Sequence, residues 1–394
     1  MKLTRYCALA AALLLGMPLR AQNSIEDVLR LIESNNAALQ ALRHENEAQK
    51  LEYRSGITLA DPEVGFSYQW GEDAATADKL TITATQSFDL SAVAGLKSNV
   101  AKEKSKLSDW QYETQRRQIL LEAKNLCIEL VYYNALNEML TSYREQAGIL
   151  VESQRKNLES GNINRLEYNN AVLRLAAVEG RTAQMEIERN TVLAKLAAMN
   201  GGETPLFNAT AYETPDMPEN FEDWYERASA ENPALQYAEQ SVMVQKKQLA
   251  LSKSQWAPAV SIGYAGEFEG DDRHNGIALG ISLPLWANLN RVKQSKAAMQ
   301  AAQYRSEDTR LQFRSSMEIL YRQTLGLKKM ADIYRASLNE SDNRRLLQKA
   351  LDEGILSVLE FLAEMDICYD ALQRTLEAEK NFQQSYAELN AFEL

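Results

Sequence analysis

The mature part of this chain consists of two copies of one long unit. When the sequence is shifted by 196 residues, positions 24–68 align with positions 220–264 without a gap and share 11 identities in 45 positions. Pro62 falls on Pro258 in this alignment. Units of this length exclude a short-period solenoid and are unusual for an enzyme. We therefore expect two equivalent halves that lie side by side in one wall.

Residues 1–21 are typical of a signal peptide. Lys2 and Arg5 precede an apolar run that is too short to span a bilayer as a helix, and we expect cleavage near Ala21. No lipid anchor is expected, because Cys7 lies at the start of the apolar run and not at the cleavage point. The segment holds three bases and no acid, so the remaining chain has 40 Lys and Arg against 54 Asp and Glu. This negative charge excludes nucleic-acid binding through the net field.

Each half is predicted to contain a helix, two strands and a long helical hairpin. The long helices lack proline and are filled with strong helix formers, so that 69 residues make a rod of about 100 Å. Two shorter helices stacked end to end match this length, which suits a tube of constant height. The expected helices cover 24–57, 91–159 and 165–200 in the first half and 220–256, 291–352 and 356–391 in the second.

These elements predict four segments along the chain. A signal peptide (1–21) is followed by a first repeat (22–200), a linker or equatorial region (201–219) and a second repeat (220–394). The repeats contain β-hairpins at 62–90 and 258–286, with acidic loops at 71–78 and 269–276, and their helical turns lie near 161 and 354.

The strands alternate large apolar residues with small or polar ones, which is the period of a β-strand with one apolar face. An ordinary sandwich core is one explanation, but the long helices leave little else to form such a core. A lipid-facing band with a polar lumen also has this pattern. Four strands cannot close a barrel, and open edges are not tolerated in hydrocarbon, so the chain would have to oligomerise. The candidate lipid-facing positions are Val64, Phe66, Tyr68, Trp70, Leu80, Ile82, Val260, Ile262, Tyr264, Ile277, Leu279 and Ile281.

Sequence signatures of catalysis, metal binding and cofactor binding are absent. The chain has only His44 and His274, and it lacks zinc-protease, CxxC, nucleophile-elbow and phosphate-loop motifs. We predict no enzyme activity, no cofactor and no metal site. Cys127 and Cys368 lie at different distances from their turns, so that level turns would keep the thiols about 30 Å apart, which is too far for a disulfide.

The order of elements resembles the outer membrane efflux protein family, the TolC-like channels. The resemblance rests on the duplicated helix–hairpin–helix plan, the prolines before the strands and the Gly-x-x-x-x-Leu-Glu turn, and it covers residues 22–394. It implies a mainly α fold with a small β part. Three copies would form a 12-stranded outer-membrane barrel continuous with a periplasmic α-helical barrel. The implied partners are two further copies, outer-membrane lipid, a periplasmic adaptor protein and an inner-membrane pump.

The resemblance also implies roles for the two helical turns. Adaptor docking is assigned to Gly161, Asn162, Ile163, Gly354, Ile355 and Leu356. An ordinary helix C-cap explains the two glycines equally well, whereas it explains the apolar residues at an exposed tip less well. Six residues beyond each glycine, Glu167 and Glu360 match the family's acidic channel entrance, although a solvated helix face is the alternative. A further acidic position of the family is Ala363 here, with Glu364 beside it.

The sequence therefore predicts a passive exit duct of a tripartite efflux pump or type I secretion system. The competing class is an exported coiled-coil adaptor, which should have one helical hairpin within β-rich domains and not two with strands of this kind. A periplasmic enzyme is the third class, and no residue constellation supports it. The cargo, the pump family of the partner and the resting state of the channel do not follow from the sequence.

Overall fold

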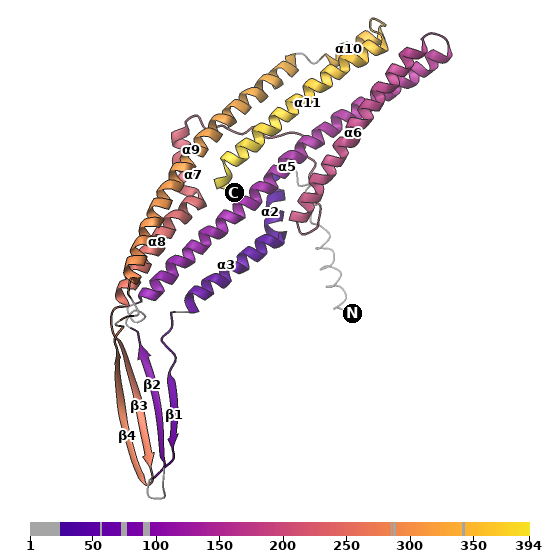
Figure 1. The fold of residues 1–394 in the computed structure, drawn as a ribbon. Helices are drawn as coiled ribbons and strands as arrows, with labels where there is room; N and C mark the ends of the chain where they lie inside the picture. Colours follow the sequence, from indigo (N-terminus) through magenta and orange to yellow (C-terminus); the bar gives the residue numbers. More distant parts are fainter. Residues whose placement is uncertain are drawn as a thin grey trace, which may run out of the picture.

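The protein is an elongated, curved body with a β-sheet at one end and two helical hairpins at the other (Figure 1). The computed structural model describes residues 24–55, 57–71, 77–89, 95–284, 286, 289–340 and 343–394. The predicted signal peptide lies outside the described residues, as does most of the first acidic loop, at 72–76.

Both halves follow one order of elements. The first half comprises α2 (Ile25–Asn35), α3 (Ala37–Ser55), β1 (Glu63–Gln69), β2 (Lys79–Phe88), α5 (Leu96–Glu159) and α6 (Arg165–Met199). The second comprises α7 (Phe221–Glu231), α8 (Pro233–Ser254), β3 (Ala259–Glu269), β4 (Asp272–Ser282), α9 (Arg291–Glu340), α10 (Arg344–Asp352), α11 (Val358–Leu389) and the short 3₁₀ turn η1 (Ala391–Glu393).

The first helix of each half was predicted as continuous, and this prediction was wrong. Asn36 separates α2 from α3, and Asn232 separates α7 from α8; both have extended backbones, with ψ of 115° and 118°. The Asn36 side chain accepts a hydrogen bond from the Leu39 amide, and Asn232 caps α8 in the same way. Pro233 disfavours helix at the preceding residue and was the signal missed. The break recurs because the two asparagines are equivalent in the duplication.

Two further boundaries differ from the sequence prediction. The helix expected over 291–352 is divided, since α9 ends at Glu340 and α10 begins at Arg344. Residues 339–343 read Asn-Glu-Ser-Asp-Asn, and such side chains compete for backbone hydrogen bonds and weaken a helix. The loop expected over 269–276 is shorter, because β3 continues to Glu269 and β4 begins at Asp272. Gly270 allows this tight connection with a φ of 56°.

The helices form a curved layer in which neighbours along the wall come from both halves. Towards the tips, α5 packs against α6 on one side and α11 on the other, and α11 packs against α9 (Figure 1). Towards the sheet, α8 lies between α5 and α9. The linker after Met199 contributes Phe207 to the core, and its Tyr212 hydroxyl donates to the carbonyl of Ile128 on α5. The duplicated halves are thus joined over most of their length.

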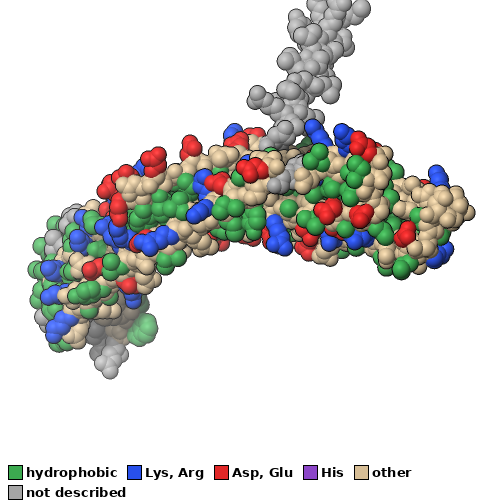
Figure 2. Space-filling view, turned by 90° about the horizontal axis from the view of Figure 1, so that it is seen from above, with side chains coloured by type: hydrophobic (Ala, Val, Ile, Leu, Met, Phe, Trp, Pro, Cys, Tyr) green, Lys and Arg blue, Asp and Glu red, His purple; other side chains and the backbone are tan. Residues whose placement is uncertain are grey.

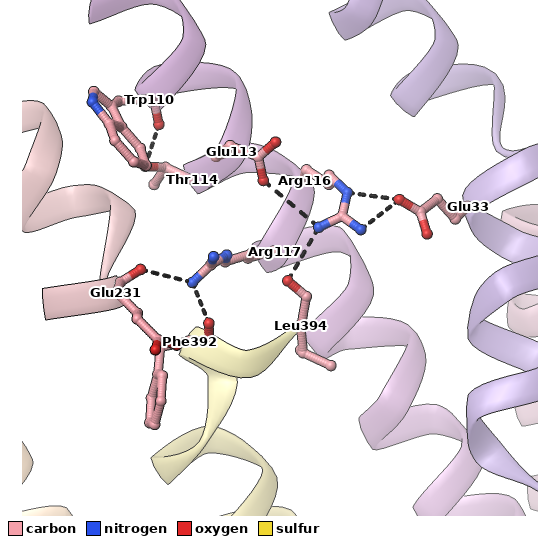
Figure 3. A network of polar contacts seen from close by, with 9 residues as sticks. All are labelled: Glu33, Trp110, Glu113, Thr114, Arg116, Arg117, Glu231, Phe392 and Leu394. Atoms are coloured by element: carbon pink, nitrogen blue, oxygen red, sulfur yellow. Dashed lines mark hydrogen bonds and ion pairs between the residues drawn. The ribbon is translucent and has the colours of Figure 1, made fainter. Parts of the chain in front are cut away.

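Two adjacent arginines of α5 connect both halves at mid-height (Figure 3). Arg116 pairs with Glu33 of α2 at 2.5 Å and donates to the Leu394 carbonyl at 3.1 Å. Arg117 donates to the carbonyl of Glu231, the last residue of α7, at 3.0 Å and also to the Phe392 carbonyl. This arginine hub, Arg116 and Arg117, satisfies backbone carbonyls at helix ends that have no intrahelical donor.

No helix in the described part of the chain is long and apolar enough to cross a membrane.

Cys127 and Cys368 differ in accessibility and are not bonded to each other. Cys127 is fully buried in α5, whereas Cys368 is partly exposed on α11. Burial raises the pKa of the Cys127 thiol to about 12, which suppresses the reactive thiolate. The absence of a bond between them agrees with the prediction from helix lengths.

We predict that a maleimide reagent at pH 7.5 labels Cys368 of the native protein while Cys127 stays unlabelled. Both thiols should react after denaturation. Mass spectrometry of tryptic peptides before and after unfolding measures this. Cys368→Ala, which leaves only Cys127, is the matched control and should show no native labelling. Rapid native labelling of Cys127 would contradict the packing of α5 described here.

Candidate functional site

The four-stranded sheet has one continuous apolar face. Its order is β1-β2-β3-β4, all antiparallel, and directly paired residues of such strands lie on the same face. Phe66 pairs with Ile82, Tyr264 pairs with Ala84 and Ile277, and Ile262 pairs with Leu279. The register therefore gathers the predicted strand positions on one face, and Trp70 follows directly after β1.

No other part of the described structure covers this face. Ten of the twelve predicted positions are exposed, with Ile277 reaching 79%, and only Leu80 and Ile82 on an inner strand are partly buried. A contiguous exposed apolar surface calls for lipid or a protein partner. A sandwich core, the alternative from the sequence, is contradicted because no second sheet or helix packs on these residues in the described structure.

The opposite face of the sheet is polar or built from small residues. Threonines alternate along β2 and pair with Gly65, Ala265 and Gly263 of the neighbouring strands. Lys79 pairs with Glu267 at 3.0 Å on this face. In the described structure, the outer edges of β1 and β4 carry backbone groups without a partner strand. The sheet thus has an apolar side, a polar side and two open edges.

At the other end of the molecule, both helical hairpins turn through the same backbone motif. Gly161 and Gly354 have φ of +73° and +71°, the left-handed conformation that glycine adopts most easily. The next amide reaches back over the helix end, from Asn162 to the Asn157 carbonyl and from Ile355 to the Ala350 carbonyl, each at 2.8 Å. This is the Schellman motif, so helix termination alone accounts for both glycines.

The apolar residues at these turns are less well explained by helix termination. In a Schellman motif the residue after the glycine often packs against the preceding helix turn, yet Ile355 is 69% exposed. Ile163 and Leu356 are partly buried. Leu166, in the first turn of α6, is also exposed and was missed by the sequence analysis because a leucine at that spacing reads as core. The tips therefore present exposed apolar side chains to solvent.

Glu167 and Glu360 have a local structural role at the start of the return helices. Asn164 caps α6, accepting from the Glu167 amide at 2.9 Å and donating to the Glu167 carboxylate at 2.6 Å. Ser357 and Glu360 form a full capping box on α11. The bond from the Ser357 amide lowers the pKa of the Glu360 carboxyl, so this cap forms above the ordinary carboxyl pKa and is lost as pH falls through the lowered value. The shared offset from the turn therefore has a structural cause.

A polar cluster that no sequence pattern revealed connects the two hairpins. It lies on the side of the tips that faces the sheet. Asp366 of α11 accepts from the Tyr143 hydroxyl of α5 at 2.8 Å and from Arg174 of α6 at 2.7 Å. Tyr143 stacks on Tyr369 with ring centroids 4.0 Å apart, and Arg181 pairs with Asp370 at 3.4 Å. Burial and the Asp366 contact raise the pKa of Tyr143, which keeps its hydroxyl protonated as a donor. We call these residues the inter-hairpin clasp.

The described residues contain no group of three or more His, Cys, Asp or Glu side chains that could hold a metal ion. His274 pairs across the sheet with Glu267 on its polar face, and His44 lies on α3. The features that stand out among the described residues are surfaces: an apolar sheet face, two open sheet edges and two apolar helical tips.

Residues 224–392 match the family model of the outer membrane efflux proteins. The chain carries an outer membrane efflux protein domain. Members of this family are ducts and not enzymes, and the match supports an outer-membrane exit duct for efflux. Comparison with curated protein sequences returns no match.

Solved outer-membrane channels share the fold of this chain. The CmeC outer membrane channel of Campylobacter jejuni superposes with a TM-score of 0.73 at 14% identity, covering 93% of this chain and 85% of that one. CusC gives 0.75 at 13% identity and covers 93% and 91%. VceC from Vibrio cholerae gives 0.69 at 15% identity and covers 95% and 96%. The similar coverage shows that the fold of both halves, including the sheet, is that of these channels.

We predict that Asn164→Ala and Ser357→Ala each destabilise the first helical turn after the tip in their own hairpin. Loss of an N-cap costs about 1 kcal/mol, so amides in the first turns of α6 and α11 should exchange about fivefold faster. Hydrogen–deuterium exchange measures this. Glu167→Gln and Glu360→Gln are the controls, since glutamine also completes a capping box. Equal exchange in the alanine variants and the wild type would refute the capping role.

Proposed function

We propose that three copies of this protein form a closed channel that crosses the outer membrane and continues through the periplasm as a helical tube. The observation that carries this proposal is the sheet, whose register sets an exposed apolar face against a polar one and leaves two edges open. In hydrocarbon each unpaired backbone group costs several kcal/mol, so only a closed sheet is stable there. Three sheets of four strands would close a barrel of 12.

The orientation of the sheet in this barrel follows from its two faces. The apolar face would contact lipid, and the threonine-rich face would line a water-filled lumen. The tyrosine and tryptophan rings of Tyr68 and Trp70 lie near one end of the apolar face, with centroids 6.2 Å apart. Such rings prefer the boundary between lipid and water. The proposal includes export by a signal peptide over residues 1–21, cleaved near Ala21, without a lipid anchor.

The tips are the proposed docking site for a periplasmic adaptor protein that connects the duct to an inner-membrane pump. Ile355 and Leu166 supply exposed apolar side chains beside the rigid Schellman turns. Exposed apolar groups on a preorganised turn can bind a partner at low entropic cost. The inter-hairpin clasp supports this arrangement by holding α6 and α11 at nearly the same level.

Glu167 and Glu360 are proposed to add a ring of negative charge at the channel entrance. The capping bonds and this role are compatible, because a capping carboxylate keeps its charge. Six carboxylates in a trimer would attract cations, and the effect would be screened by salt. A coiled-coil adaptor, the competing class, is disfavoured by the four strands with an exposed apolar face.

We predict that the protein is found in the outer-membrane fraction as a trimer that requires detergent for extraction. The reason is the open sheet, which cannot be stable in lipid as a single copy. Sucrose-gradient fractionation followed by mass photometry in detergent measures both location and copy number. A monomer in the soluble periplasmic fraction would refute the proposed function.

We also predict that Glu167→Gln/Glu360→Gln reduces cation selectivity and block by divalent cations in planar bilayers. The change removes two negative charges per chain at the tips and retains the helix caps. The control Glu145→Gln/Glu388→Gln removes the same charge away from the tips and should leave selectivity nearly unchanged. If both double variants behave like the wild type, the entrance charge is not carried by Glu167 and Glu360.

A further inference from the structure

Two helices carry an exposed glycine in the centre of an exposed apolar stripe. The stripe residues recur every seven positions, so they lie on one face of each helix. Figure 2 shows hydrophobic patches between charged side chains along the helical body. The α6 stripe consists of Leu173, Gly180 and Ile187, and the α9 stripe consists of Ile319, Gly326 and Ile333.

The chain itself gives no reason for these two glycines. Glycine within a helix lowers its stability, and a close neighbour that excludes a Cβ atom is the usual compensation. A Cβ atom added at Gly180 or Gly326 would have no heavy atom within 4 Å, and neither residue has a positive φ. The space above each glycine is open in the single chain, as expected for a site that receives a side chain from another molecule.

The two stripes lie on opposite flanks of the protein. Towards the tips the order is α6, α5, α11 and α9, so that α6 and α9 are the outer helices (Figure 1). The open sheet edges have the same arrangement, with β1 from the first half and β4 from the second. A second copy that continues the sheet from β4 to β1 therefore also brings its α6 towards α9.

The charged residues beside the two stripes have opposite signs and would attract each other. Glu179 and Glu186 are exposed on α6, one position before Gly180 and Ile187. Arg322 and Lys329 are exposed on α9, four positions before its own stripe residues. Arg322 already pairs with an acid of α9, so Lys329 is the cation available to an acidic neighbour. Opposite charges at the border of an apolar seam steer association and fix its register.

We propose that α6 of one copy packs antiparallel against α9 of a second copy, with Gly180 opposite Ile333 and Ile187 opposite Gly326. Each isoleucine then fills the space above a glycine, as a knob fills a hole. This interaction surface rests on the proposed function, because it presupposes copies that stand side by side with their tips level.

The positions along the two helices agree with this pairing. Gly180 and Ile333 lie 19 and 21 residues from their turn glycines, and Ile187 and Gly326 lie 26 and 28 residues from them. Both pairs are offset by the same two residues, so the two matches occur in one register. Shifting the register by one heptad would place isoleucine against isoleucine. Shifting it by two heptads would again match Leu173 with Gly326 and Gly180 with Ile319, but it would displace the tips of the two copies by about 21 Å, so level tips select this register.

Cysteine pairs test the register directly. In a Cys127→Ala/Cys368→Ala background, Gly180→Cys/Ile333→Cys and Ile187→Cys/Gly326→Cys should form disulfides between copies on mild oxidation. The mismatched pair Gly180→Cys/Gly326→Cys is seven residues, about 10 Å, out of register and should link at least tenfold less. Non-reducing gels of membranes measure the linked species. Equal yields from matched and mismatched pairs would overturn the proposal.

A size exchange provides the second test. Gly180→Ile should reduce the assembled fraction at least fivefold by filling the hole, and Gly180→Ile/Ile333→Gly should restore most of it. Native mass spectrometry in detergent measures assembly in all variants. Assembly without register-specific links and without rescue would refute this seam and leave the proposed function intact. Absence of any assembly in the unmodified protein would refute the proposed function itself.

Discussion

Unpaired backbone groups at the two edges of the sheet are the constraint on which the rest of the molecule depends. Within one chain, β1 and β4 each have a free side, and the face that joins them is apolar. Water can form hydrogen bonds with these backbone groups, but exposure of the apolar face to water is unfavourable. Hydrocarbon accommodates the apolar face but leaves the backbone groups without hydrogen-bond partners. A neighbouring strand at each edge would supply the missing hydrogen bonds and allow the apolar face to lie in hydrocarbon. In the proposed trimer, the long helices would act as a scaffold that holds adjacent sheets at the spacing and tilt that such pairing needs.

Much of the fold could be predicted because its signals are local and repeated. The period-2 pattern of the strands fixes which residues share a face, and the observed register places the predicted positions together. Helix breaks were predicted less well. Asn36 has no proline after it, and only the equivalent Asn232-Pro233 marks the break clearly. Reading the two copies as evidence for each other would have located both breaks. The inter-hairpin clasp was unpredictable, since Arg174 and Asp366 are 192 residues apart and each resembles an ordinary surface charge.

Glu167 and Glu360 show how a structural role and a functional hypothesis can rest on the same residue. A carboxylate three positions into a helix is favoured by capping and by the helix dipole, whatever the helix does afterwards. In a duplicated hairpin this preference places two acids at matching heights. In the proposed channel, a charged entrance would require no additional residues, because the capping carboxylates would also supply the charge. For this reason an acidic pattern near a turn is weak evidence for an entrance when considered without the capping geometry.

The arginine hub has a consequence for the order in which the molecule is completed. Arg116 and Arg117 bind carbonyls of Leu394 and Phe392, which are separated from them by more than 270 residues. β1 and β2 precede the arginine hub in the chain, and β3 and β4 lie between it and Phe392, so all four strands are synthesised before Phe392. Contacts of such long sequence separation form late because of the loop entropy that they must overcome. The strands therefore become available while the middle of the helical body is still open, and the contacts of the arginine hub with Phe392 and Leu394 close it.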